Sequence, residues 1–207
     1  APKPLEHNQM NIDHAEVYEY ALKEFKKKRK FTPEFIQLVC ARVMKHTGRQ
    51  INTAYGFYDE TRGDFRLVPV TAGGTDFPHH TKVKELTRKM CKKYNMSIMN
   101  IKNNKDILDL AADVHYSLVS IHPFSDGNGR TARIIMNAVL FTFDMPRLIL
   151  PAEKKGLYYK ALKETREKSD ITLFRDYIYQ NYINQLTTEL EKQKNIARKK
   201  GMYLGFY

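Results

Sequence analysis

Two strongly apolar stretches with helical periodicity lie in the middle of the chain, and only a short polar segment separates them. In the first stretch, apolar side chains recur every three or four residues on a wide stripe, which is typical of a helix buried on most of its surface. The residues of this stripe are Ile107, Ala111, Val114 and Leu118. The second stretch runs from Ile134 to about Phe143. The two stretches predict a pair of central helices, joined by a loop that begins near Pro123.

Further helices are predicted on both sides of this pair. Asp13 is the predicted N-cap of a helix that runs to Lys28, and Thr32 followed by Pro33 marks the start of a second helix. Three more helices are predicted from periodicity, over residues 81–94, 153–168 and 172–197. The fold class predicted is therefore mostly α, with a helical bundle as its core.

Residues 52–74 differ from this pattern, because β-prone residues alternate there with turn residues. The run from Gly56 to Tyr58 and the run from Phe65 to Val70 flank a turn-rich hexapeptide, which predicts an irregular β-hairpin. Pro69 has no N–H to donate to a ladder, so the second strand is expected at an edge of the sheet, where a partner can pair with it.

Composition limits the class of protein. The 207 residues are 42% hydrophobic and 12% aromatic, which supplies enough apolar material for one full core, and we expect a single domain. No apolar run approaches the roughly 20 residues that cross a bilayer, and the N-terminus does not resemble a signal peptide. Cys40 and Cys91 form neither a metal-binding pattern nor a disulfide framework, which suits a reducing compartment. A cytoplasmic protein without membrane contact is expected.

The charge is strongly positive, with 35 Lys and Arg against 23 Asp and Glu, a formal net charge of +12. Such a balance raises the hypothesis of nucleic-acid binding, because basic side chains neutralise phosphates. The cations nevertheless lie in three separate runs, over residues 26–30, 88–93 and 192–200, without a nucleic-acid-binding module. We interpret the runs as solvated helix surface, with attraction to an acidic partner as the second interpretation; nucleic acid is an unlikely partner.

The segment between the central helices, residues 122–133, concentrates side chains with chemical functions. It reads His-Pro-Phe-Ser-Asp-Gly-Asn-Gly-Arg-Thr-Ala-Arg. Each residue alone has an ordinary structural interpretation, such as a capping histidine or an Asp-Gly turn, but their joint occurrence between two apolar helices favours a site. The glycines on either side of Asn128 let backbone N–H groups converge, and the start of the next helix adds the positive end of its dipole. This shape suits an anion such as a diphosphate.

Three kinds of side chain complete the predicted site. Arg130 and Arg133 lie one helical turn apart, so both can reach the same anion. Asp126 stands beside the predicted phosphate position, where Mg²⁺ takes one carboxylate together with phosphate oxygens and water. His122 carries an imidazole, whose ordinary pKa of about 6.5 suits a general base at neutral pH.

These residues resemble the signature of the Fic (filamentation induced by cAMP) family, His-x-Phe-x-[Asp/Glu]-Gly-Asn-Gly-Arg-x-x-Arg, and every defined position matches. The resemblance covers residues 4–182. It implies one Fic-type domain over residues 1–207. Its parts would be N-terminal helices at 1–50, a hairpin over the active site at 52–74 called the flap, a catalytic core at 81–182, and a C-terminal helix and tail at 183–207. The implied activity is that of a protein adenylyltransferase, which moves AMP from ATP to a Ser, Thr or Tyr hydroxyl and releases pyrophosphate.

The resemblance also implies a role for each site residue. His122 would deprotonate the hydroxyl of a protein target docked on the flap hairpin, Asp126 would hold Mg²⁺, and Phe124 would anchor the loop in the core. The residues expected to bind ATP are Gly127, Asn128, Gly129, Arg130, Arg133, Ala72, Gly73, Gly74, Thr75, Tyr158 and Tyr159. Within this set, the tyrosine pair would contact the nucleoside and the flap residues would close over it.

The sequence departs from the family pattern at two points. Arg166 stands where some members have an asparagine near the nucleoside. An inhibitory helix of many members, [Ser/Thr]-x-x-x-Glu-[Gly/Asn], has only half matches here, at Glu85 and Glu191, which leaves open a missing inhibitory helix or an inhibitory chain as a partner.

Two alternative functions remain at this point. One is a Fic-type transferase of another phosphate-containing group; Gly129, where the branch resembling Doc toxins has Lys, disfavours phosphorylation. The other is a catalytically silent nucleotide-binding or protein-interaction module. A silent member is expected to have lost the base, and His122 is present.

Overall fold

The computed structural model describes residues 5–28 and 30–199 and divides into two compact units, the first ending at Pro146 and the second beginning at Arg147. The predicted single Fic-type domain over 1–207 stays a prediction. Among the described residues, no helix combines the length and the apolar character needed to cross a membrane.

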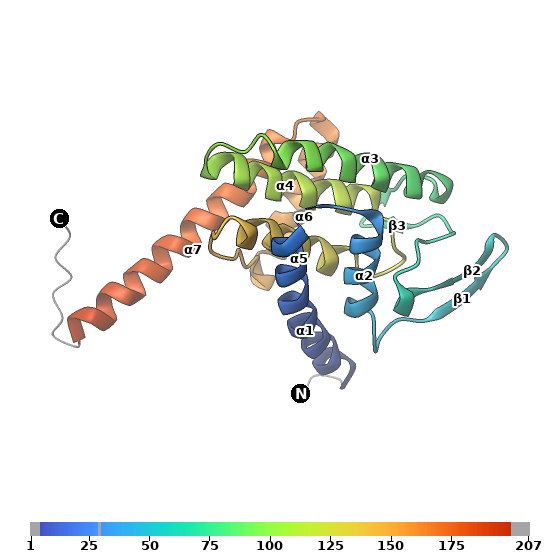
Figure 1. The fold of residues 1–207 in the computed structure, drawn as a ribbon, viewed down its shortest axis with the longest axis horizontal. Coiled ribbons are helices and arrows are strands. Elements are labelled where there is room, and N and C mark those ends of the chain that lie inside the picture. Colours follow the sequence, from blue (N-terminus) through green and yellow to red (C-terminus); the bar gives the residue numbers. More distant parts are fainter. Residues whose placement is uncertain (1–4, 29, 200–207) are drawn as a thin grey trace. The chain divides into compact units, whose positions relative to one another are not determined.

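Five α-helices make up most of the first unit (Figure 1). They are α1 (Leu5–Lys28), α2 (Pro33–Val43), α3 (His80–Ile98), α4 (Asn104–Ile121) and α5 (Asn128–Thr142). Helix α5 packs against α4, α1 and α2, while α3 lies beside α4. Ile134, Ile135 and Met136 of α5 are fully buried, as is Leu118 of α4. The prediction of two central helices, α4 and α5, is confirmed, and so is a mostly α fold.

Local side chains determine where several helices begin. Thr32 caps α2, since its hydroxyl accepts the N–H of Phe35 at 3.0 Å, and Pro33 occupies the first turn as predicted. Asn103 caps α4 in the same way, accepting the N–H of Asp106 at 3.0 Å. The predicted start of the first helix at Asp13 is wrong. Helix α1 already begins at Leu5, because residues 5–12 contain no helix-breaking glycine or proline.

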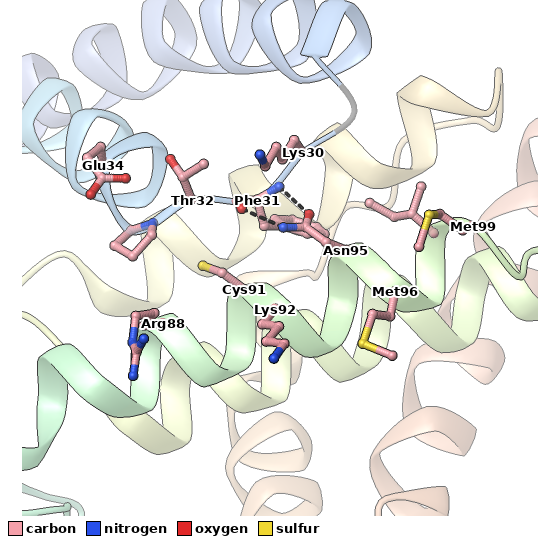
Figure 2. A pocket seen from close by; sticks show the side chains of 12 residues that line it. Lys30, Phe31, Thr32, Glu34, Arg88, Cys91, Lys92, Asn95, Met96 and Met99 are labelled. Atoms are coloured by element: carbon pink, nitrogen blue, oxygen red, sulfur yellow. Dashed lines mark hydrogen bonds between the residues drawn. The ribbon is translucent and has the colours of Figure 1, made fainter.

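The N-terminal end of α2 is attached to α3 by a pair of hydrogen bonds (Figure 2). The Asn95 side chain accepts the N–H of Phe31 at 2.7 Å and donates to the Phe31 carbonyl at 2.8 Å. A cavity of about 610 Å³ lies beside this attachment and is lined by residues including Lys30, Arg88 and Met99. The opposite end of α2, at Met44, faces the loop between α4 and α5, so the cavity is separate from the site described below.

The β structure differs from the predicted hairpin. Strand β1 (Gln50–Thr53) pairs antiparallel with β2 (Gly56–Asp59), with Thr53 opposite Gly56. A second, shorter pair joins β3 (Thr71–Ala72) and β4 (Thr75–Asp76). The 3₁₀ helix η1 (Glu60–Arg62) follows β2.

The predicted strand over residues 65–70 is wrong, as is its interpretation as a sheet edge. The N–H of Arg66 donates to the Pro123 carbonyl at 3.0 Å, and the Arg66 side chain occupies the Val68 carbonyl. These backbone groups therefore bind the loop after α4 and a neighbouring arginine rather than a strand. The tertiary contacts override the β propensity of the local sequence.

The second unit consists of η2 (Ala152–Lys154), α6 (Lys155–Lys168) and α7 (Thr172–Lys199). Both helices match the predicted ranges closely. They pack through aromatic side chains, with the ring of Tyr158 at 6.3 Å from Phe174 and 6.2 Å from Tyr177. Asp170 starts α7 by accepting the N–H of Thr172 at 2.9 Å. The predicted tail after this helix, at 200–207, lies outside the described residues.

Candidate active site

His122 ends α4 in a backbone conformation that is rare for residues other than glycine. It is the C-cap of the helix, with φ 50° and ψ 61°, and its N–H donates to the Leu118 carbonyl at 2.9 Å. The imidazole is half-buried, and its Nδ1 lies 3.3 Å from the Val119 carbonyl oxygen. The left-handed turn directs the chain away from the helix axis and begins the loop in which the sequence predicts a site.

The loop after His122 is held in shape by the side chain of Asn128. Its amide donates to the Phe124 carbonyl at 2.8 Å, and its oxygen accepts the Phe124 N–H at 3.0 Å. Phe124 is buried, with its ring 5.7 Å from that of Phe65. The buried side chain of Asn128 therefore serves the loop itself, and a contact with phosphate would come from its backbone N–H.

Gly127 makes the turn into α5. It has φ 79°, and a Cβ there would lie 3.0 Å from Met44 Sδ and 3.4 Å from Cys40 Sγ, so the floor of the loop leaves little room for a side chain. Burial raises the pKa of the Cys40 thiol to about 12, which keeps this floor uncharged. The Gly127 carbonyl accepts the N–H of Thr131 at 2.9 Å, which is the first hydrogen bond of α5. The N–H groups of residues 128–130 therefore have no carbonyl partner within the helix.

Arg130 presents an unused donor at this helix start. Its Nη2 contacts Asp126 Oδ2 and Met44 Sδ, each at 3.1 Å. Its Nη1 is buried and has no hydrogen-bond partner among the described residues. Buried polar atoms are almost always satisfied, so an unsatisfied guanidinium N–H beside a helix N-terminus points to an anionic ligand.

Arg133 lies close to the loop on the following turn of α5. A Cβ at Gly129 would be 3.4 Å from Arg133 Nη1, so the guanidinium passes beside this glycine. Burial and, to a smaller extent, the charge of Arg133 lower the pKa of His115 on α4 to about 3. His115 is fully buried and, with this pKa, is neutral there.

Asp126 has the exposure and chemistry that a magnesium ligand needs. Its side chain is 65% exposed, and its two oxygens accept from Gly127 N at 2.6 Å and from Arg130 Nη2. No group of three or more His, Cys, Asp or Glu gathers among the described residues. A single exposed carboxylate fits Mg²⁺ that is bound mainly through substrate phosphates and water.

The turn between β3 and β4 contains the four flap residues that the resemblance selected. Gly73 and Gly74 both have positive φ, 58° and 72°, as a two-residue turn of this hand requires. Nothing lies within 4 Å of a Cβ placed at either glycine, so the turn between Ala72 and Thr75 is open. The flap in the structure is the ladder of residues 71–76, which is much shorter than the hairpin predicted at 52–74.

Arg66 connects this flap to the loop, and the sequence analysis did not single it out. The buried guanidinium donates to three backbone carbonyls, those of His122, Val68 and Pro78. One signal was available, since Arg66 is a lone cation in the β-prone run of residues 65–70. Phe77, which stacks on the His122 ring, had no comparable signal.

The remaining predicted residues lie elsewhere. Tyr158 and Tyr159 belong to α6 of the second unit, where their rings are 5.3 Å apart and Tyr159 is exposed. Of the half matches to the inhibitory pattern, Glu85 pairs with Lys89 at 2.7 Å on α3, and Glu191 belongs to α7 of the second unit.

Of the neighbouring histidines His79 and His80, the first is exposed and the second is buried. His80 begins α3, is buried, and has its ring 4.6 Å from that of Tyr55. The tip of the β1–β2 hairpin covers it, a contact between distant segments that the local sequence does not indicate.

Comparison with known proteins agrees with the Fic signature that this histidine, loop and arginine pair carry. The model of the Fic/DOC family matches residues 30–140. The match covers more than half of the chain, which therefore belongs to this family, as the signature predicted.

The curated relatives are named as adenylyltransferases. Protein adenylyltransferase fic-1 of Caenorhabditis elegans is 35% identical over 102 residues, which are 46% of this chain and 20% of that protein. Protein adenylyltransferase Fic of Drosophila grimshawi is 36% identical over 116 residues, 56% of this chain and 23% of that protein. The chain thus matches about a fifth of the length of these relatives.

Solved structures confirm the fold. A Fic-domain-containing signalling protein from Bacteroides thetaiotaomicron superposes with a TM-score of 0.75 and 22% identity, over 99% of this chain and 78% of that one. Fic-1 from C. elegans gives a TM-score of 0.65 and 23% identity, over 86% of this chain and 51% of that one.

Proposed function

We propose that the chain transfers AMP from ATP to a Ser, Thr or Tyr hydroxyl of a protein target, with release of pyrophosphate. The observation that carries the proposal is the buried, unpartnered Nη1 of Arg130 at the N-terminus of α5, on the loop that His122 begins. A donor of this kind needs an acceptor, which a phosphate oxygen of ATP would supply, and the imidazole of His122 would supply the base. The names of the curated relatives support the same reaction.

His122 acts as the general base in this proposal. The target hydroxyl loses its proton to the imidazole as its oxygen attacks the α-phosphorus of ATP, and the bond from that phosphorus to the bridging oxygen of pyrophosphate breaks. Attack at phosphorus depends chiefly on positioning and on neutralising charge. The fixed backbone of His122, held at its N–H by Leu118 and at its carbonyl by Arg66, meets the first requirement.

The start of α5 meets the second requirement. Backbone N–H groups of Asn128 and Gly129, together with the guanidinium groups of Arg130 and Arg133, would bind the phosphates. Asp126 would hold Mg²⁺, which when bound neutralises charge on the phosphate oxygens. The flap turn at residues 72–75 would cover the nucleotide, and Tyr158 and Tyr159 would contact its nucleoside end.

The flap also provides the proposed docking site for the target. Thr71 and Ala72 of β3 are exposed, and an extended target segment would pair beside this strand. An inhibitory chain or helix that pairs with Arg133 would act on the same phosphate position.

The proposal is tested with ATP labelled at either the α- or the γ-phosphate. The protein and Mg²⁺ are incubated with a cell lysate, and modified peptides are identified by mass spectrometry. We expect label from the α-phosphate on target hydroxyls, and transfer to fall by about 10² to 10⁴ in His122→Ala. His46→Ala, at an exposed histidine outside the site, is the matched control. Transfer of the γ-phosphate, or full activity of H122A, would contradict the proposal.

A further inference from the structure

We propose that Arg66 is a positioning residue for the transfer: its guanidinium fixes the flap relative to His122, so that a target docked on the flap is presented to the base. The inference rests on the proposed function, and it deepens that proposal by naming the residue that couples target docking to catalysis.

Three hydrogen bonds from one side chain make the connection. Arg66 Nε donates to the His122 carbonyl at 2.7 Å, Nη1 to the Val68 carbonyl at 2.7 Å, and Nη2 to the Pro78 carbonyl at 2.5 Å. Val68 precedes β3 and Pro78 follows β4, so the guanidinium binds both ends of the flap and the base-bearing residue at once. A guanidinium is planar and its donors point in fixed directions, which defines the relative positions of all three carbonyls.

The backbone of Arg66 strengthens the attachment. Its N–H donates to the Pro123 carbonyl at 3.0 Å, so side chain and main chain together bind two successive carbonyls of the loop. Both carbonyls lie more than fifty positions along the chain from Arg66. This contact therefore fixes the loop to the flap segment from a distance.

Burying the charge of Arg66 costs desolvation free energy, which is more than attachment of the flap alone would require. The side chain is only 1% exposed, and no ion pair with a carboxylate involves it among the described residues. Burial lowers its pKa accordingly. A buried cation satisfied only by carbonyls is seldom optimal for stability, and a neutral apolar side chain there would avoid the desolvation cost.

The acceptor at His122 explains why the cation is useful. His122 has φ 50°, a conformation that persists in a residue with a side chain only where its surroundings impose it. Arg66 binds the carbonyl of this residue while Leu118 binds its N–H. This backbone fixes the direction of the Cα–Cβ bond of His122, so Arg66 positions the start of the imidazole side chain together with the flap.

This geometry predicts which kinetic step depends on Arg66. A base must lie within hydrogen-bond reach of the proton it removes, and a misplacement of about 1 Å can reduce rate about 10²-fold. Loss of Arg66 should therefore lower kcat for the protein target, while the phosphate contacts at the start of α5 keep the affinity for ATP.

The experiment compares Arg66→Lys and Arg66→Gln with Arg62→Lys and Arg62→Gln, matched changes at an exposed arginine four residues away. Hydrogen–deuterium exchange is measured over residues 68–78 and over α5, together with kcat for the target and Kd for ATP. We expect both R66 variants to exchange at least about tenfold faster in the flap but not in α5. Their kcat should fall about 10²-fold with Kd for ATP changed less than about threefold. The R62 variants should resemble the wild type.

Wild-type exchange in the flap of R66K and R66Q would overturn the inference, and so would faster flap exchange with unchanged kcat. The exchange measurement needs no activity. Absence of AMP transfer by the wild type would therefore contradict the proposed function, while the exchange rates would still show whether Arg66 fixes the flap.

If neither R66 variant folds, as judged by the absence of cooperative unfolding, the attachment is tested by nuclear magnetic resonance of the ¹⁵N-labelled wild type. The Nε–H of Arg66 should then exchange far more slowly than that of Arg62, because it is buried and bound to His122. Equal exchange of the two Nε–H groups would overturn the inference.

Discussion

The ring of Phe77 stacks on the ring of His122, with centroids 4.0 Å apart and planes 22° from parallel. Phe77 directly follows β4, so the flap contacts the imidazole of His122 through this side chain. The flap is also joined to the His122 backbone through Arg66, which binds the carbonyls of Pro78 and His122. The imidazole is thus confined on one face by an aromatic ring whose own position depends on the flap.

Replacing Phe77 by Ala should lower kcat/KM for the protein target by about tenfold, because the imidazole gains freedom to leave the orientation that receives the proton. The ring is only half-buried, so thermal unfolding should change little. Steady-state kinetics with Phe57→Ala as the control measures this effect, since Phe57 is an aromatic on β2 that is 49% exposed. Equal activity of F77A and F57A would contradict a role for the stacked ring.

Replacing Asn128 by Ala should cost about 2 kcal/mol in the free energy of unfolding, because the buried N–H and carbonyl of Phe124 both lose their partner. Urea denaturation measures this difference. Asn100→Ala is the matched control, since that amide makes one exposed bond to the Met96 carbonyl. A loss in N128A no larger than in N100A would show that water replaces the amide at the loop.

Replacing Arg130 by Met should weaken ATP binding by about tenfold to a hundredfold, the range expected when a charge-assisted hydrogen bond is lost. The unpartnered Nη1 is the reason, since its only proposed partner is the phosphate. Calorimetric titration with ATP and Mg²⁺ measures the affinity, and Arg62→Met provides an exposed control. Wild-type affinity in R130M would place the phosphates elsewhere.

Stability should fall with acid because of His115. Burial, with a smaller contribution from Arg133, lowers its pKa from 6.5 to about 3, so the folded state keeps it neutral while the unfolded state takes up a proton below 6.5. Protonation of the unfolded state should therefore destabilise the fold by up to about 1.4 kcal/mol per pH unit between about 6.5 and 3.

Urea denaturation at several pH values tests this dependence. In His115→Leu the slope between pH 6.5 and about 4 should be smaller by that amount, and His46→Leu, at an exposed histidine, is the matched control. Parallel stability curves for H115L and the wild type would mean that other groups cause the acid sensitivity.

The helices around the site were predicted well because their signals are local. The apolar stripe of α4, the proline after it and the glycine before α5 lie within a few residues of the structure they determine. The β structure was predicted less well. Residues 65–70 have β propensity, yet Arg66 donates its N–H and its Nε–H to a loop more than fifty residues away, and its guanidinium binds the Val68 carbonyl.

The sequence by itself determined which groups the candidate site contains: an imidazole at the end of a buried helix, then a carboxylate, two glycines and two arginines in an order that predicts an anion-binding loop. Only the tertiary structure decided how these groups are held. The amide of Asn128 serves Phe124, Arg66 joins His122 to the flap, and Phe77 covers the imidazole. The physical reason is that a buried polar group must find a partner wherever the fold brings one, and that partner need not be near in sequence.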